Sequence, residues 1–166
     1  MRAGAVNSVP NDQVDQAAVT AAAPLSAFEI LLLYADRTWL WKDGAAYFAK
    51  DGRQLRAWTG GEGASIGEGN WVVRDDGKLC MDAYWTARTG SAKARTCYSL
   101  HKSLDTTYQR KDPDGLWYVF KAPNEKSTQE YANFKFGDNT AESFEKVRKI
   151  VRPEEKAAPA PVKAGG

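Results

Sequence analysis

The chain has 166 residues, with 23 Lys or Arg against 21 Asp or Glu, so its formal net charge is only +2. This length suits one domain with tails, and the balanced charge excludes the strong positive field that recruits nucleic acid or anionic membranes. The apolar run at 28–34 is interrupted by Glu29 and is far shorter than the roughly 18 residues needed to span a bilayer. We therefore expect no membrane span and no nucleic-acid partner.

Residues 1–24 are mainly Ala, Val, Asn, Asp and Gln without a regular apolar period, and we expect them to be disordered. They show no positively charged segment followed by an apolar core and a cleavage site, so no signal peptide is visible. Ser26 and Glu29 then have the spacing of a capping box, which predicts a short helix over 27–34. Its Phe28, Leu31, Leu32 and Tyr34 are expected to pack against a sheet.

Hairpin signals follow the helix. The segments 38–42, 45–50 and 53–58 are separated by Asp-Gly pairs, which favour tight two-residue turns. Such turns place an apolar set on one face, namely Trp39, Trp41, Ala46, Phe48, Leu55 and Ala57. The glycine-rich stretch 60–69 is expected to be a loop, because no helix with a Lys-Ser/Thr pair follows it as in a phosphate site.

The best-constrained stretch is 78–101, where two alternating segments each contain one cysteine. Placing Cys80 opposite Cys97 also sets Leu79 opposite Tyr98, so the apolar faces of the two strands coincide. These are the only two cysteines, and a disulfide between them is typical of an oxidising compartment. Two free thiols are the alternative. Two cysteines and one histidine do not complete a zinc site, so we predict no metal and no cofactor.

Further strands are expected at 70–74, 105–110 and 116–121, which gives about eight short antiparallel strands in all. A mainly β meander of this size closes into a lipocalin-like barrel or, alternatively, folds as a β-sandwich. The apolar spacing within residues 140–151 predicts an amphipathic C-terminal helix. The expected elements are therefore a short N-terminal helix, the sheet and this C-terminal helix. The expected organisation is a disordered segment at 1–24, a single β-barrel domain at 25–151 and a disordered Ala/Pro tail at 152–166.

Several aromatic and cysteine landmarks occur in order along the chain: TWLWKDGAAYF at 38–48, a Gly-x-Trp-x-Val strand at 69–73, GKLCMDAYW at 77–85, RTCYSLH at 95–101 and GLWYVFK at 115–121. Over about residues 26–122 they resemble the alphaproteobacterial family filed as domain of unknown function number 995. The resemblance implies an exported, periplasmic protein. It implies no activity, ligand or catalytic residue.

His101 is the only histidine, and Ser99 shares its face of the sheet while Asp105 lies across the turn. A Ser-His-Asp set on one surface hairpin would be exposed and would have no obvious oxyanion hole. We therefore predict no catalytic residue, and a hydrolase is the least favoured function.

Aromatic side chains support a binding function instead. Alternation directs one set into the barrel, where bulky rings either fill the core or line a pocket for a small apolar or aromatic molecule. This set comprises Trp39, Trp41, Phe48, Trp71, Trp85, Tyr98, Tyr108 and Tyr118. A second set is directed outward, where it binds a protein or carbohydrate or is covered by the C-terminal helix. This set comprises Tyr47, Trp58, Tyr84 and Trp117.

The sequence thus predicts a non-catalytic periplasmic or secreted protein that binds a small hydrophobic or aromatic ligand in the barrel interior. The alternative is a structural or regulatory protein of the cell envelope that interacts through its outward aromatic face.

Overall fold

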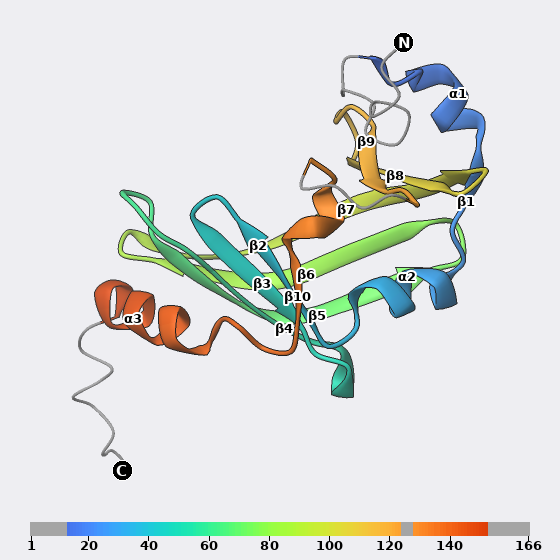
Figure 1. Ribbon diagram of the computed structural model, residues 1–166. Coiled ribbons are helices and arrows are strands. Elements are labelled where there is room, and N and C mark those ends of the chain that lie inside the picture. The colour runs from blue at the N-terminus through green and yellow to red at the C-terminus, as the bar shows by residue number, and fades with distance from the viewer. Residues whose placement is uncertain (1–12, 124–127, 153–166) are drawn as a thin grey trace.

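One continuous antiparallel sheet dominates the computed structural model, which describes residues 13–123 and 128–152 (Figure 1). Nine strands lie in the order β10-β2-β3-β4-β5-β6-β7-β8-β9, and a short tenth strand, β1, pairs with the end of β7. The strands are β1 (Ala23–Pro24), β2 (Arg37–Trp41), β3 (Gly44–Phe48), β4 (Gln54–Thr59), β5 (Ser65–Arg74), β6 (Lys78–Ala87), β7 (Gly90–Ser103), β8 (Thr106–Lys111), β9 (Tyr118–Lys121) and β10 (Phe134–Phe136).

The predicted antiparallel meander is confirmed, and it corresponds to β2 through β9. The two additional strands, β1 and β10, have only two and three residues, too few for an alternating pattern to show. The sheet curls into a half-barrel, because within the described residues its outermost strands β9 and β10 are not paired with each other. A single curled sheet also rules out the β-sandwich alternative for this part of the chain.

The curl of the sheet defines a concave and a convex face. Trp39 on β2 contacts Tyr98 on β7 with ring centroids 5.2 Å apart, although four other strands lie between β2 and β7 in the sheet. Their shared face is therefore the concave one. It contains the main core, in which Phe48, Trp71 and Phe120 are fully buried.

Helix α2 (Ala27–Tyr34) packs on the concave face at one end of the half-barrel. It has the predicted bounds and the predicted capping box between Ser26 and Glu29. The expected packing of Phe28 and Leu32 was wrong, because 65% and 58% of their surfaces are exposed. Ile30 and Tyr34 are buried instead. Apart from Glu29, apolar residues lie all around the helix, so its pattern does not indicate which side packs.

The gap between β9 and β10 is bridged by the connection that contains the 3-10 helix η4 (Glu130–Asn133). Its Tyr131 packs on Phe120 with ring centroids 5.2 Å apart, and Phe134 at the start of β10 stacks on Trp39 at 5.3 Å. These side chains cover the core where a closed barrel would have another strand pair.

The convex face is covered at its two ends by α1 (Gln16–Ala21) and α3 (Ala141–Val151) (Figure 1). Helix α3 confirms the predicted amphipathic helix and buries Phe144, Val147 and Val151 over β4 and β5. Helix α1 and strand β1 occupy residues that we expected to be disordered. Residues 1–12 and 153–166 of the two expected disordered segments lie outside the described residues.

Long-range contacts rather than local pattern hold α1 in place. Gln16 donates to the carbonyl oxygen of Trp117 at 3.2 Å and accepts from its backbone N–H at 2.7 Å. The Trp117 indole donates to Thr20 at 2.9 Å. A segment of six residues has no stability of its own, which explains why the sequence alone did not indicate this helix.

Strand β5 begins at Ser65, inside the stretch expected to be a loop. Glycine is required at positions 67 and 69 because atoms of the neighbouring strand β6 lie too close for a side chain. A Cβ on Gly69 would lie 1.9 Å from the Asp82 carbonyl oxygen, and one on Gly67 would lie 2.9 Å from the Trp85 ring. Because these two strand positions lack a side chain, the Asp82 backbone and the Trp85 ring can pack directly against β5.

None of the helices in the described residues is long and apolar enough to cross a membrane.

Candidate functional site

The half-barrel is packed solid at the end where α2 lies. Phe48 and Trp71, two of the eight residues proposed to line a pocket, are fully buried and meet edge to face with ring centroids 5.5 Å apart. Tyr34 of α2 adds further ring contacts with Phe48 and Phe120. These side chains fill the core and leave no surface for a ligand at this end.

Polar atoms within the concave face already have partners. The Tyr34 hydroxyl donates to Gln109 Oε1, and Gln109 Nε2 donates to the Tyr118 hydroxyl at 2.5 Å. The Trp39 indole donates to Glu130 at 2.7 Å. Burial raises the pKa of Tyr98 to about 12 and also raises the pKa of Tyr118. The tyrosines of the deep interior thus stay protonated at neutral pH, and the polar atoms named here satisfy one another.

The opposite end of the concave face is more open. One row of paired residues crosses six strands there: Trp39, Ala46, Ala57, Gly67, Trp85 and Ala92. Ala46, Ala57 and Gly67 lie between the two tryptophans, and Ala92 lies beside Trp85. These small residues leave room for indole rings on the concave face.

Two tryptophans use this room. The ring of Trp85 lies against Gly67, and the ring of Trp41 lies close to Gly44, where an added Cβ would be 3.0 Å from Cε3. Both indoles remain partly exposed, and Trp41 also contacts Trp39 at a centroid distance of 6.1 Å. The open end therefore presents indole surface toward solvent.

A hollow of about 450 Å³ lies beside Trp85 at the tips of β5, β6 and β7. Its lining combines that indole with small or hydroxyl side chains, including Ser65, Ala87, Ser91 and Ala92. No charged side chain lines it. The hollow is shallow and largely open to solvent, although its volume lies within the range of about 300–1,000 Å³ that is usual for small-molecule sites.

Tyr108 lies on the convex face, although we expected it in the interior. The two-residue turn between β7 and β8 pairs Tyr108 with His101, so both project to the same side. Tyr108 packs there beside the Trp117 and Val119 cluster under α1. Of the predicted interior set, the structure brings Trp39, Trp41 and Tyr98 into one row of ring contacts and places Trp85 near the open end.

The outward aromatic set is divided by the flanking helices. Trp117 is buried beneath α1, and Trp58 packs against the apolar residues of α3. Tyr47 is partly buried and donates to Asp36 at 2.7 Å. Only Tyr84 is largely free, with 53% of its surface exposed.

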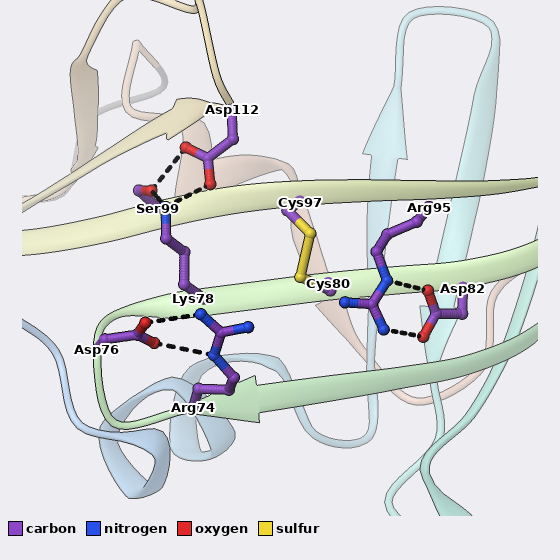
Figure 2. The surroundings of a disulfide bond; sticks show 9 residues. All are labelled: Arg74, Asp76, Lys78, Cys80, Asp82, Arg95, Cys97, Ser99 and Asp112. Carbon is purple, nitrogen blue, oxygen red and sulfur yellow. Dashed lines mark hydrogen bonds and ion pairs between the residues drawn. A yellow bond between two sulfur atoms is a disulfide. The ribbon is translucent and has the colours of Figure 1, made fainter.

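The predicted disulfide between Cys80 and Cys97 is formed on the convex face of the β6–β7 hairpin (Figure 2). On one side of it Arg95 makes two hydrogen bonds to Asp82, at 2.6 and 2.9 Å. On the other side Lys78 donates to Ser99 at 2.6 Å. Three successive outward pairs of this hairpin are therefore cross-linked by covalent or polar contacts.

Ser99 and His101 have separate partners. The Ser99 hydroxyl donates to Asp112 at 2.6 Å, and Lys78 also binds that carboxylate (Figure 2). His101 Nδ1 lies 2.8 Å from the Val19 carbonyl oxygen, and its ring packs on Trp117 at 4.6 Å. The sequence pattern did not reveal the Lys78–Ser99–Asp112 cluster, because Asp112 comes from the turn after β8. Ser99 is buried and Lys78 is ion-paired, so this cluster has the features of a structural clamp. The described residues contain no group of three or more His, Cys, Asp or Glu arranged to hold a metal.

The family model described as "Protein of unknown function (DUF995)" matches residues 3–140. The chain belongs to this family. The match is longer than the resemblance over 26–122, since it also includes α1, η4 and β10, and it ends at the residue before α3. Neither the curated proteins nor the solved structures contain a match to the chain.

Proposed function

We propose that the protein is a non-catalytic, exported binding protein that takes a small apolar or aromatic molecule at the open end of its half-barrel. The observation that carries this proposal is the pair of partly exposed indoles, Trp41 and Trp85, each close to a glycine of the concave face. The adjoining hollow of about 450 Å³ supplies space for a ligand.

The lining favours a neutral ligand. An indole offers a flat apolar surface that stacks on another ring or on aliphatic groups. Ser65 adds a hydroxyl group at the edge of the hollow, and no charged side chain lines it. A charged ligand would lose its hydration there without gaining an opposite charge.

The proposed compartment is the periplasm or the extracellular space. A disulfide between the only two cysteines supports it, because such bridges persist in oxidising compartments and are rare in the cytosol.

An envelope protein that interacts through its outward aromatic face is the weaker alternative. Two of its four proposed contact residues, Trp58 and Trp117, are covered by α3 and α1. The remaining exposed aromatic surface is chiefly Tyr84.

Binding of the neutral fluorescent probe N-phenylnaphthylamine tests the proposal. The wild type is expected to bind it saturably, and Trp85→Ala is expected to weaken binding by about tenfold because the stacking surface is lost. Tyr84→Ala is the matched control, since it changes the adjacent residue on the opposite face of the same strand. This control is expected to bind as the wild type does.

A second variant guards against a folding defect in Trp85→Ala. Ala92→Glu introduces a charge at an exposed position of the hollow and is also expected to weaken binding of the neutral probe. Absence of saturable binding to the wild type would overturn the proposal. Equal affinity of both variants and the wild type would do the same.

A further inference from the structure

The convex face contains two adjoining hollows, of about 430 and 540 Å³, between the ends covered by α1 and α3. The first lies over β3, β4 and β5, and the second over β5, β6 and β7. Glu68, Gly69 and Asn70 line both. The two hollows therefore form one continuous strip across five strands.

The register of the sheet arranges this strip as two parallel rows. The first row reads Tyr47, Arg56, Glu68, Tyr84 and Lys93, one residue from each strand. The second reads Gln54, Asn70, Asp82 and Arg95. Because neighbouring strands lie about 4.8 Å apart, the longer row extends for roughly 19 Å. A ligand that fits this strip is elongated.

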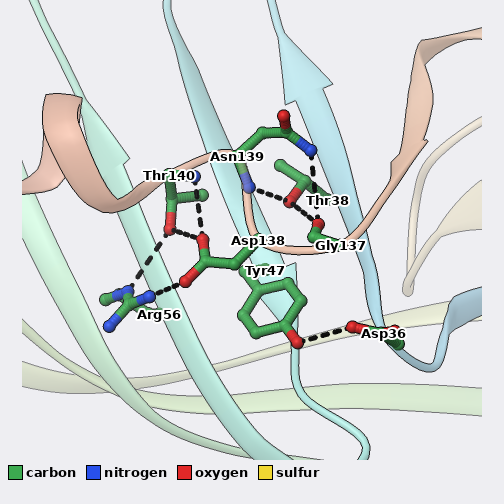
Figure 3. Close-up of polar contacts among 8 residues, drawn as sticks. All are labelled: Asp36, Thr38, Tyr47, Arg56, Gly137, Asp138, Asn139 and Thr140. Carbon is green, nitrogen blue, oxygen red and sulfur yellow. Dashed lines mark hydrogen bonds and ion pairs between the residues drawn. The ribbon is translucent and has the colours of Figure 1, made fainter.

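The β3–β4 end of the strip is held in a fixed arrangement (Figure 3). Arg56 pairs with Asp138 and donates to the Thr140 hydroxyl at 3.3 Å, and Thr140 donates to the same carboxylate at 2.6 Å. Tyr47 is held by its hydrogen bond to Asp36. These contacts fix two side chains of the first hollow before any ligand arrives, which lowers the entropic cost of binding.

The second hollow also contains an ion pair. Asp82 and Arg95 neutralise each other through two hydrogen bonds (Figure 2). With Arg56 paired as well, both guanidinium groups of the strip are already neutralised. The one other cation of the strip, Lys93, is balanced in number by Glu68, so the strip has no excess positive charge for a phosphate or sulfate group.

Between these fixed groups lie side chains that have no partner within the described part of the chain: Gln54, Glu68, Tyr84 and Lys93. In the first row the exposed ring of Tyr84 has the Glu68 carboxylate on one neighbouring strand and the Lys93 ammonium group on the other. A flat ring is thus flanked by an acceptor and a donor. The Asn70 amide nitrogen contacts the carbonyl oxygens of Gly52 and Arg53, which leaves its own oxygen free to accept.

We propose that this convex strip binds a neutral linear oligosaccharide. A sugar ring has an apolar face of C–H groups that stacks on Tyr84, and its hydroxyl groups donate to Glu68 and accept from Lys93. The strip is too polar for an apolar ligand. It runs across the strands, whereas an added peptide strand would lie along the edge of β7 that β8 leaves unpaired at 90–96.

Isothermal titration with maltotriose and with N-acetylglucosamine trisaccharide tests this site. At least one trisaccharide is expected to bind the wild type, and Tyr84→Ala is expected to weaken it by about tenfold through loss of the stacking ring. Tyr84→Phe keeps the ring and is expected to retain binding. Trp85→Ala is the matched control on the opposite face, and it is expected to leave trisaccharide affinity unchanged.

Lack of binding to both trisaccharides would overturn the inference, as would equal affinities of wild type and Tyr84→Ala. A sulfated trisaccharide that binds more tightly than both neutral ones, with an affinity that falls as salt rises, would overturn the assignment of a neutral ligand. The outcome is independent of the concave site, because Tyr84 and Trp85 project to opposite faces.

Discussion

Gln109 is the residue that joins α2 to the last strands of the sheet. It is fully buried on the concave face, accepts from the Tyr34 hydroxyl and donates to the Tyr118 hydroxyl. These bonds hold Tyr34 in the core, together with the burial of Ile30 and the ion pair between Glu29 and Lys102. With α2 held in this orientation, Phe28 and Leu32 point away from the core.

Gln109→Leu is expected to lower the free energy of unfolding by about 3 kcal/mol, because two hydrogen bonds are lost and the Tyr34 hydroxyl is left buried without a partner. Tyr118→Phe removes only one of these bonds and is expected to cost about 1 kcal/mol. Urea unfolding measures both values. Gln54→Leu, at an exposed position, serves as the control and is expected to change stability by less than about 0.5 kcal/mol. Equal values for Gln109→Leu and Gln54→Leu would contradict this role of Gln109.

Single residues also show where alternation along a strand is insufficient to predict the burial of a side chain. Alternation assigns both Trp71 and Trp85 to the concave side, and both lie there. Alternation did not distinguish the buried Trp71 from the partly exposed Trp85. That difference depends on which end of the half-barrel α2 covers. Tyr108 was misplaced because the length of the turn before it decides its face.

The β6–β7 hairpin is the element that the sequence predicted in most detail. Its pairs Leu79–Tyr98 and Cys80–Cys97 follow the expected register. Two independent constraints, coinciding apolar faces and facing cysteines, agreed on one register there. The polar pairs beside the disulfide then strengthen the same alignment on the convex face.

Replacing both cysteines by serine is expected to lower the free energy of unfolding by about 3 kcal/mol, since the bridge closes a loop with a sequence separation of 17. Chemical denaturation of the oxidised wild type and of the double variant measures the difference. The wild type with reductant present serves as a control, and it should match the variant. If reduction leaves the midpoint unchanged, the hairpin does not depend on the bridge.

Other elements were predictable only in part, because some depend on contacts between residues far apart in the sequence and others are very short. The capping box at Ser26 is local, and α2 has the predicted bounds. Helix α1 depends on Gln16 contacting Trp117, which is 101 residues away, and strand β10 consists of only three residues. Neither element has a local signature that would have revealed it.

At the scale of the whole molecule, tyrosines link the parts of the core. Tyr34 comes from α2, Tyr98 from β7 and Tyr118 from β9. Burial raises the pKa of Tyr98 to about 12, and burial also raises the pKa values of Tyr34 and Tyr118. In the unfolded chain these groups ionise near their ordinary pKa of about 10. The folded state therefore holds its phenolic protons more tightly than the unfolded state.

Stability from these tyrosines is fully present below about pH 10 and is lost as pH rises through their raised pKa values. We expect tyrosinate absorbance to increase in at least two steps during alkaline titration. The last step should coincide with the loss of far-ultraviolet circular dichroism. Tyr98→Phe is expected to reduce the amplitude of that last step. Ionisation of all seven tyrosines in one step, with the dichroism unchanged, would contradict burial of this cluster.

The incomplete closure of the sheet has a consequence for how copies of the protein behave when crowded together. A long exposed edge strand is a template on which other chains add by backbone pairing. Here the outermost strands β9 and β10 have only four and three residues, and η4 packs beside both. These two outermost strands thus offer little unpaired backbone, whereas residues 90–96 of β7 extend beyond β8 and have no neighbouring strand on that side within the described part of the sheet. Strand-by-strand aggregation is therefore expected to begin at this segment of β7 rather than at β9 or β10, and the charged side chain of Lys93 within it opposes such pairing.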